Sequence, residues 1–340
     1  MITFFISAIK IIILLGLLIF IHELGHFTVA KLCNVKVNEF AIGFGPTIYK
    51  KQGKETKYNL RLIPLGGFIS MEGEEERSND SRSYSKVSIL KRMAIVFAGP
   101  IVNILFATVI YFLLTFSAGP YISNEVNEIL PGYGAENSGI QVNDIIIGIN
   151  GEKVESKYDL SKIIDTSNGQ NLNIEVNRNG EILQYNVKPT EVKLAEDIFT
   201  YYIGISFKPA RDNFINRCIN GTISTKEFLI SIVDNIKQLF TGKVGVDKMM
   251  GPVGISKVVA KTDGFKEFIQ MMALISLSLG VTNLLPIPAL DGGRILILLI
   301  EAIRRKPLNE KLEINIQLLG FSFLIILSLY ITYNDILRIF

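Results

Sequence analysis

Two histidines and a glutamate near the N-terminus are the clearest candidates for chemistry in this sequence. The segment His22-Glu23-Leu24-Gly25-His26 contains both histidines of the chain. Residues four apart share one face of a helix, so both imidazoles can bind the same metal ion. Glu23 directly follows the first histidine, where its carboxylate can take a proton from a water molecule that the metal activates. The motif therefore indicates metal-dependent hydrolysis.

The position of this motif argues against a purely structural role. Residues 4–20, which precede it, are apolar apart from Ser7 and Lys10. Imidazole and carboxylate groups at the end of a membrane helix are costly unless they are paired or used. The alternative is that the two histidines lie on the helix surface and bond only to local partners. That role does not explain why such unfavourable groups occur at the end of a membrane helix.

A third metal ligand has to come from a distant part of the chain. Zinc in hydrolases takes three protein ligands and leaves one position open. With no third histidine, the candidates are Asp, Glu or Cys at membrane depth, and Asp291 ends the third apolar stretch in NLLPIPALDGGR. Its alternative role is a helix N-cap. Glu301 is the second candidate ligand, although we expect it to pair with Arg304 and Arg305.

Two prolines and two asparagines are candidates for contact with a substrate. Pro286 and Pro288 break regular helix and free backbone groups next to Asp291. Asn283 could bind a substrate backbone or an oxyanion, or it could form an interhelical hydrogen bond. Asn103, in the second apolar stretch, has the same two interpretations, and packing is the favoured one.

Four long apolar stretches indicate a membrane protein. Hydrophobic residues make up 49% of the 340 residues and charged residues only 20%, while a net charge of +3 gives no sign of nucleic-acid binding. Each stretch has about the 20 residues that a spanning helix needs. They cover residues 4–32, 93–118, 268–290 and 314–333. We expect an α-helical polytopic protein with four transmembrane helices in the plasma (inner) membrane.

The basic residues predict the orientation of these helices. Residues 31–92 contain twelve lysines and arginines, and residues 304–311 contain four. Basic loops remain in the cytoplasm. Both termini and residues 119–266 are then expected outside the cytoplasm, with the metal site toward the cytoplasmic side. Cys33 and Cys218 would lie on opposite sides, which excludes a disulfide.

The segment between the second and third apolar stretches has a soluble composition and predicts a small β-rich domain. Its strand-like runs are residues 145–149, 171–176 and 182–187. Asn150-Gly151 after the first run is typical of a hairpin turn, and residues 160–164 predict a short helix. Residues 226–240 repeat apolar side chains at helical spacing. They predict an amphipathic helix on the membrane surface or against the β domain.

The first basic loop also contains strand-like pieces. Residues 41–46 and 58–68 are apolar and rich in glycine. Such backbone is tolerated beside a membrane only where protein covers it, so we expect a membrane-associated β-hairpin that can pair with an extended substrate. The residues expected to contact the substrate there are Gly66, Gly67 and Phe68. The polar residues 72–92 are expected to be exposed or mobile.

These observations predict four parts of the chain. They are a first part of the membrane core at 1–120, an extracytoplasmic β domain at 121–208, an amphipathic connection at 209–266 and a second part of the membrane core at 267–340.

Taken together, the motifs resemble the site-2 protease family of intramembrane zinc metalloproteases, and in particular its bacterial members of the regulator-of-sigma-E protease type. The resemblance rests on HELGH at 22–26, NLLPIPALDGG at 283–293, GFGP at 43–46, PLGGF at 64–68, FAGP at 97–100 and GPVGI at 251–255. Residues 135–151 resemble part of a PDZ domain. We find one PDZ-like copy, whereas some members of the family have two.

The resemblance implies a function and a set of roles. Zinc would be held by His22, His26 and Asp291, and Glu23 would be the catalytic base. The substrates would be single-pass membrane proteins already cut once by another protease, such as anti-sigma factors and remnant signal peptides, in regulated intramembrane proteolysis. The inserted PDZ-like α+β domain would bind or exclude the substrate's ectodomain or its new C-terminus.

Two other classes of function use the same residues differently. In a membrane metal transporter or sensor with a PDZ interaction domain, His22, His26 and Asp291 would be a transit site and Glu23 would be dispensable. In a scaffold, the PDZ-like domain would recruit partners and the metal site would be vestigial. Replacement of Glu23 separates both from a protease, since only a protease needs a base.

Overall fold

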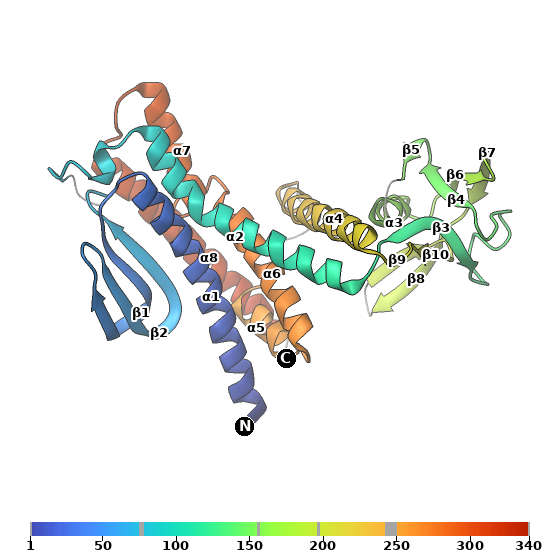
Figure 1. The fold of residues 1–340 in the computed structure, drawn as a ribbon, viewed down its shortest axis with the longest axis horizontal. Coiled ribbons are helices and arrows are strands. Elements are labelled where there is room, and N and C mark those ends of the chain that lie inside the picture. The colour runs from blue at the N-terminus through green and yellow to red at the C-terminus, as the bar shows by residue number, and fades with distance from the viewer. Residues whose placement is uncertain (1, 75–77, 155–156, 196–197, 242–249, 339–340) are drawn as a thin grey trace. The chain divides into compact units, whose positions relative to one another are not determined.

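The computed structural model describes residues 2–338 apart from 75–77, 155–156, 196–197 and 242–249 (Figure 1). The chain forms two compact units. The first combines residues 1–111 with 229–340, and the second comprises residues 112–228. Each unit is built around its own hydrophobic clusters.

Helices make up most of the first unit. They are α1 (Ile2–Leu32), α5 (Pro252–Ala260), α6 (Phe265–Asn283), α7 (Asp291–Arg304) and α8 (Glu310–Leu337), together with parts of α2 (Ile89–Ala118) and α4 (Phe214–Phe240). Four helices in the described residues are long and apolar enough to cross a membrane, and they lie in α1, α2, α6 and α8. Each of the four apolar stretches predicted to span the membrane thus contains a helix that is long and apolar enough to do so.

The third span is shorter than predicted. We expected it to continue to residue 290, but α6 ends at Asn283 and residues 284–290 form an irregular connection to α7. Pro286 and Pro288 lack the N–H groups that a continuing helix needs, and Ala289 has a positive φ of 73°. The chain turns sharply as a result and begins α7 at Asp291.

A long antiparallel hairpin follows α1. Strands β1 (Val37–Gln52) and β2 (Lys57–Met71) pair along their length with several register shifts. The end near α1 is buried, because Val37 and Met71 pack with Ala30 of α1 and Ile95 of α2. The rest of the hairpin exposes large apolar side chains: Phe44, Ile48, Tyr49, Leu62 and Ile63. The predicted hairpin is confirmed, and its exposed apolar surface is what a membrane-associated element requires.

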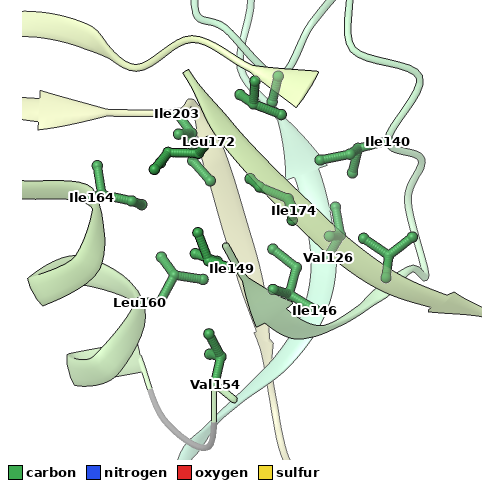
Figure 2. Close-up of a cluster of buried hydrophobic side chains, with 13 residues drawn as sticks. Val126, Ile140, Ile146, Ile149, Val154, Leu160, Ile164, Leu172, Ile174 and Ile203 are labelled. Carbon is green, nitrogen blue, oxygen red and sulfur yellow. The ribbon is translucent and has the colours of Figure 1, made fainter. Parts of the chain in front are cut away.

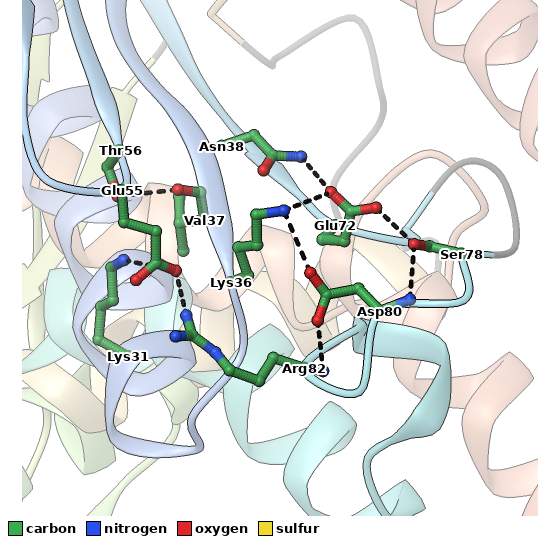
Figure 3. A network of polar contacts seen from close by, with 10 residues as sticks. All are labelled: Lys31, Lys36, Val37, Asn38, Glu55, Thr56, Glu72, Ser78, Asp80 and Arg82. Carbon is green, nitrogen blue, oxygen red and sulfur yellow. Dashed lines mark hydrogen bonds and ion pairs between the residues drawn. The ribbon is translucent and has the colours of Figure 1, made fainter.

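The polar segment after β2 is held in place by charged groups (Figure 3). Lys36 lies 3.1 Å from Asp80, and Glu72 accepts hydrogen bonds from Asn38 at 2.9 Å and from Ser78. Arg82 pairs with Glu55 of the hairpin turn, which also lies near Lys31. Several described residues of this segment are exposed, as expected, and ion pairs with Lys36 and Glu55 connect it to the hairpin.

The second unit contains a five-stranded antiparallel sheet in the order β10-β3-β4-β6-β7, with a short sixth strand, β5, at β4. The strands are β3 (Ile122–Ile129), β4 (Ile145–Ile149), β5 (Glu152–Lys153), β6 (Leu172–Arg178), β7 (Glu181–Val187) and β10 (Ile205–Pro209). Strands β8 (Thr190–Ala195) and β9 (Ile198–Tyr202) form a separate hairpin, and α3 spans Lys157–Thr166. Asn150 and Gly151 have φ of 52° and 80°, as a two-residue hairpin turn requires.

Among the described residues, the second unit has a single apolar core. Thirteen buried side chains from the sheet, α3 and the loops meet in one cluster (Figure 2). Leu160 and Ile164, one helical turn apart, point from α3 into this cluster. The predicted strands and short helix thus fold as one small α+β unit. The helix predicted at 226–240 is present, but α4 begins earlier, at Phe214.

Candidate metal centre

Three side chains from distant parts of the first unit converge on one point. His22 and His26 lie one turn apart on α1, and their Nε2 atoms are 3.2 Å apart. The Oδ2 atom of Asp291 lies 3.1 Å from Nε2 of His22 and 3.5 Å from Nε2 of His26. All three side chains are largely buried. These three residues are the one group of potential metal ligands found among the described residues.

The connection between α6 and α7 positions Asp291. Gly292 and Gly293 follow it in the first turn of α7, and a Cβ at either would lie within 2.4 Å of a backbone oxygen of residues 284–287. Only glycine allows this close approach, which holds the turn against the start of the helix. The N-cap of α7 is Leu290. The alternative N-cap role for Asp291 is therefore wrong, and its carboxylate faces the histidines.

The donor set fits a zinc ion. Two imidazole nitrogens and one carboxylate oxygen are ligands that zinc accepts, and three protein ligands leave a fourth position open. The buried Oδ2 atom of Asp291 has no hydrogen-bond partner in the described structure. Two facing Nε2 atoms at 3.2 Å and an unpartnered carboxylate oxygen are the arrangement that a shared cation would satisfy.

Glu23 lies beside these ligands in the same cavity. The cavity has a volume of about 940 Å³ and is lined by His22, Glu23, His26 and Asp291 together with residues of β2, α2 and the segment after β2. A Cβ at Gly67 would lie 3.1 Å from Cγ of Glu23. Strand β2 therefore passes close to the glutamate, which places a β-edge next to the candidate base.

The structure brings some of the predicted substrate contacts to the cavity. Phe68 lines it, and Gly67 packs against Glu23. Gly66 is buried against the ring of Phe44. These three positions remain predictions for substrate binding.

The other three predicted contacts lie elsewhere in the first unit. Asn283 ends α6, Pro286 is exposed, and Pro288 packs on Gly320 of α8, where a Cβ would lie 2.3 Å from the Pro288 carbonyl oxygen. In the described structure, none of them is among the residues that line the cavity. Pro288 thus has a clear packing role.

Glu301 is not positioned as a ligand. Its carboxylate lies 3.1 Å from Arg92 of α2 and accepts a hydrogen bond from the backbone N–H of Leu308 at 2.8 Å. We expected Arg304 and Arg305 as its partners, but the side chain turns inward from α7 and is buried. The partner on α2 is distant in sequence, and no local pattern indicates it.

Two further residues lie near the site, and the sequence singled out only one of them, Asn103, for which an interhelical contact was the favoured interpretation. Arg294 lies one turn after Asp291, lines the cavity and pairs with Glu74 at 2.5 Å. Asn103 is fully buried on α2, with its side-chain amide 3.4 Å from Nδ1 of His22. Arg294 follows the LDGG segment at i+3 of Asp291, a spacing that puts both on one helical face and would have drawn attention to it.

The chain matches a known protein family over nearly its whole length. The profile of Peptidase family M50, the family of the site-2 proteases, matches residues 10–327. The chain belongs to this family. The M50 match contains both the HELGH segment of α1 and the LDGG segment of α7.

Individual relatives agree with the family assignment. The chain is 31% identical to the regulator of sigma-W protease RasP of Bacillus subtilis, with 98% of this chain and 99% of the relative covered. It is 28% identical to the zinc metalloprotease RasP of Geobacillus kaustophilus, with 98% of each covered. A protein of Clostridium acetobutylicum, whose name assigns it provisionally to the zinc metalloproteases, is 36% identical over 98% of both chains.

The chain is thus an intramembrane zinc metalloprotease of the site-2 type. Its cofactor is Zn²⁺, and its four apolar helices make it an integral membrane protein.

Proposed function

We propose that this M50 protease holds its zinc through His22, His26 and Asp291 and uses Glu23 as the catalytic base to cut transmembrane segments. The observation that supports this is the convergence of the three ligand atoms, with distances of 3.1, 3.2 and 3.5 Å, beside Glu23 in one cavity. A bound zinc ion supplies Lewis acidity, which lowers the pKa of water and polarises the scissile carbonyl.

Glu23 carries the proton in the proposed mechanism. Its carboxylate accepts a proton from the attacking water and then donates it to the nitrogen of the leaving amine. Both transfers need the side chain within hydrogen-bond reach of the reacting atoms, and the position of Glu23 in the cavity that the three proposed ligands line supports this role. The close approach of Gly67 limits the positions that the Glu23 side chain can adopt.

The hairpin is proposed to bind the substrate as an added strand. The amides of a transmembrane helix are bonded internally, so its scissile carbonyl has to be exposed by local unwinding. An unwound segment can pair with the edge of a strand. Strand β2 passes the cavity at Gly67 and Phe68. We assign substrate contact to these two residues and to Gly66, and also to Asn283, Pro286 and Pro288 of the segment before Asp291.

The second unit is proposed to be a PDZ-like domain that controls access. Its antiparallel sheet with the packed helix α3 supports an α+β fold of this kind. It contains none of the proposed catalytic residues. We propose a membrane core at 1–120 and 267–340, the PDZ-like domain at 121–208 and an amphipathic connection at 209–266. We further propose that the domain and both termini are extracytoplasmic and that the site opens toward the cytoplasm, as the basic loops predict.

The proposed substrates are single-pass membrane proteins that another protease has already shortened. One relative is named a regulator of sigma-W protease, which supports anti-sigma factors, and remnant signal peptides have the same single-span form. The test is co-expression of the full chain with a tagged single-pass protein, either full-length or truncated outside the membrane. The proposal predicts loss of the truncated form with the wild type and its persistence with Glu23→Gln.

A further inference from the structure

One face of α2 lies directly against the two histidines. Ile95, Gly99 and Asn103 are spaced four residues apart on this helix, so they form one stripe. A Cβ at Gly99 would lie 2.3 Å from Nε2 of His26 and 2.8 Å from Cε1 of His22. The missing side chain at Gly99 therefore makes room for both imidazoles, and the residues one turn before and after it meet their far nitrogens.

His26 shows how this face orients a ligand. The Nδ1 atom of His26 lies 2.7 Å from the backbone oxygen of Ile95. A carbonyl oxygen only accepts, so Nδ1 carries the proton and donates it. The other nitrogen, Nε2, then has a free lone pair and points toward Asp291, as a metal ligand must.

His22 needs an equivalent acceptor, and Asn103 is the residue in place to provide it. Nε2 of His22 faces Asp291 at 3.1 Å, so zinc binding through Nε2 leaves the proton on Nδ1. Nδ1 faces the Asn103 amide at 3.4 Å, with the nitrogen Nδ2 toward it and the oxygen Oδ1 buried without a hydrogen-bond partner in the described structure. Two N–H groups cannot bond to each other. Rotating the amide by half a turn keeps its shape and brings Oδ1 to Nδ1.

We infer that Asn103 is a positioning residue for the zinc ligand His22, with Oδ1 accepting a hydrogen bond from Nδ1–H. This inference rests on the proposed zinc site. Hydrogen bonds to the far nitrogen of a ligating histidine fix its tautomer and ring orientation, and their loss typically costs about 10- to 100-fold in metal affinity. Asn103 thus acts on the metal through His22.

The backbone of Asn103 is held independently of its amide. The hydroxyl of Ser276 on α6 donates to the carbonyl oxygen of Asn103 at 2.9 Å, and both residues are fully buried. Ser276→Ala removes this contact between helices and leaves the amide untouched. It is the matched control for packing at the same position.

The experiment measures zinc affinity of the full chain in detergent by competition with a chelator. We expect Asn103→Leu, which keeps the approximate size but removes the acceptor, to weaken zinc binding at least about 10-fold. Asn103→Asp, which has an oxygen on either side, should restore at least the wild-type affinity, and Ser276→Ala should leave it unchanged. If Asn103→Leu does not fold, Asn103→Ala, which also removes the acceptor, takes its place.

The outcomes separate the inference from the proposed function. Wild-type affinity in Asn103→Leu would overturn the inference, and so would equal loss in Asn103→Leu and Asn103→Asp, because an acceptor would then not be what matters. If His22→Ala also kept wild-type affinity, the proposed zinc site itself would be wrong. The absorption spectrum of the Co²⁺-loaded protein gives a second readout: it should change in Asn103→Leu and return in Asn103→Asp.

Discussion

At the scale of single residues, the account depends on three ligands that only the folded chain brings together. His22→Ala and Asp291→Asn each remove one of the converging ligand atoms. We expect the purified wild type to hold about one zinc ion per chain and each variant to lose most of it. Metal analysis of the detergent-solubilised protein measures this. Undiminished zinc in both variants would contradict the ligand assignment.

Gly99 should tolerate no side chain. Gly99→Ala places a methyl group 2.3 Å from Nε2 of His26, so the imidazole has to move away from the other ligands. We expect zinc binding to fall at least about 10-fold, as for other losses of ligand orientation. Gly280→Ala is the control, because its Cβ would lie 2.8 Å from the Pro100 carbonyl oxygen, at a helix contact without an imidazole. Equal zinc affinity in Gly99→Ala and the wild type would show that the histidines can rearrange.

The three residues that converge in the cavity could be predicted from the sequence, but the residues of α2 that pack against the two histidines could not be assigned to them. The two histidines of HELGH have the spacing of one helical turn, and Asp291 is an isolated charge at the end of an apolar stretch. Both features can be recognised in the sequence alone. Asn103 and Gly99 acquire their roles because α2 packs on α1, and Glu301 finds Arg92 through the packing of α7 on α2. Such pairings depend on tertiary contacts that no local spacing contains.

At the scale of elements, Asp335 fastens α5 to α8. Its Oδ2 atom accepts hydrogen bonds from the backbone N–H groups of Gly251 and Gly254, at 3.0 and 2.7 Å, at the start of α5. Asp335 is 3% exposed, so a lost acceptor leaves two buried donors unpaired. This contact explains the GPVG segment, since a Cβ at either glycine would lie 2.9 Å from the carboxylate.

Removal of this contact should lower stability. Asp335→Ala is expected to cost about 2–3 kcal/mol, because it leaves two buried donors unsatisfied and each costs about 1–3 kcal/mol, while Asp335→Asn keeps an acceptor and costs less. Thermal unfolding of the full chain in detergent compares them, with Tyr333→Phe at an exposed neighbouring position as control. Equal unfolding temperatures for Asp335→Ala and the wild type would show that the contact of Asp335 with α5 does not stabilise the protein.

A second contact between elements is the ion pair of Asp144 with Arg178 of β6 in the second unit. Burial of Asp144 opposes its ionisation, but hydrogen bonds from Arg178 and from the backbone N–H of Gln141 outweigh this and hold its pKa below the usual value. The charged form is therefore favoured by folding. This contribution is fully present above the pKa of an unfolded aspartate, about 4, and is lost as pH falls through the lowered pKa of Asp144.

We expect Asp144→Asn to destabilise the second unit at pH 7 by about 1.5–3 kcal/mol, the range for hydrogen bonds to a charged group, because the buried carboxylate that Arg178 and the Gln141 N–H bind is lost. The chain contains no tryptophan, so Phe207→Trp, at a half-buried position against this core, gives a fluorescence signal for this unit alone in the full chain. In urea unfolding, the difference between the Asp144→Asn variant and the protein that keeps Asp144 should shrink as pH falls below about 4. A difference that is independent of pH would show that the charge is not responsible.

Secondary structure was predictable where it followed local rules. The hairpin at Asn150-Gly151, the strands of β6 and β7 and the four apolar helices follow from alternation, turn residues and length. The end of α6 at Asn283 and the ordered segment after β2 did not follow. In the first case the turn needs the backbone contacts of Gly292 and Gly293, and in the second it needs ion pairs with Lys36 and Glu55.

At the scale of the whole molecule, the separate second unit predicts control of access. Residues 112–228 form their own contact unit, and every proposed ligand and the proposed base lie in the other one. Replacement of residues 121–208 by a short flexible linker should leave zinc binding intact and narrow the difference in cleavage between a full-length and a pre-trimmed substrate. If the linker variant is folded and zinc-loaded but cuts neither, the unit is needed for catalysis and does not act as a gate.

The proposed orientation can be tested in intact cells. In a background with Cys33 and Cys218 replaced by serine, new cysteines at the exposed Ser161 and Ser81 report on the second unit and on the first basic loop. The positive-inside rule predicts that a membrane-impermeant thiol reagent labels Ser161→Cys and leaves Ser81→Cys unlabelled. The reverse labelling would invert the topology.

The central claim is that Glu23 performs proton transfer at a zinc site that exists without it. The most direct measurement uses purified wild type and Glu23→Gln with a pre-trimmed single-pass substrate, and determines zinc content and cleavage rate on the same samples. The account predicts about one zinc per chain in both proteins and a cleavage rate lowered at least about 100-fold in Glu23→Gln, the typical contribution of a general base. Cleavage by Glu23→Gln at the wild-type rate, with zinc retained, would contradict it.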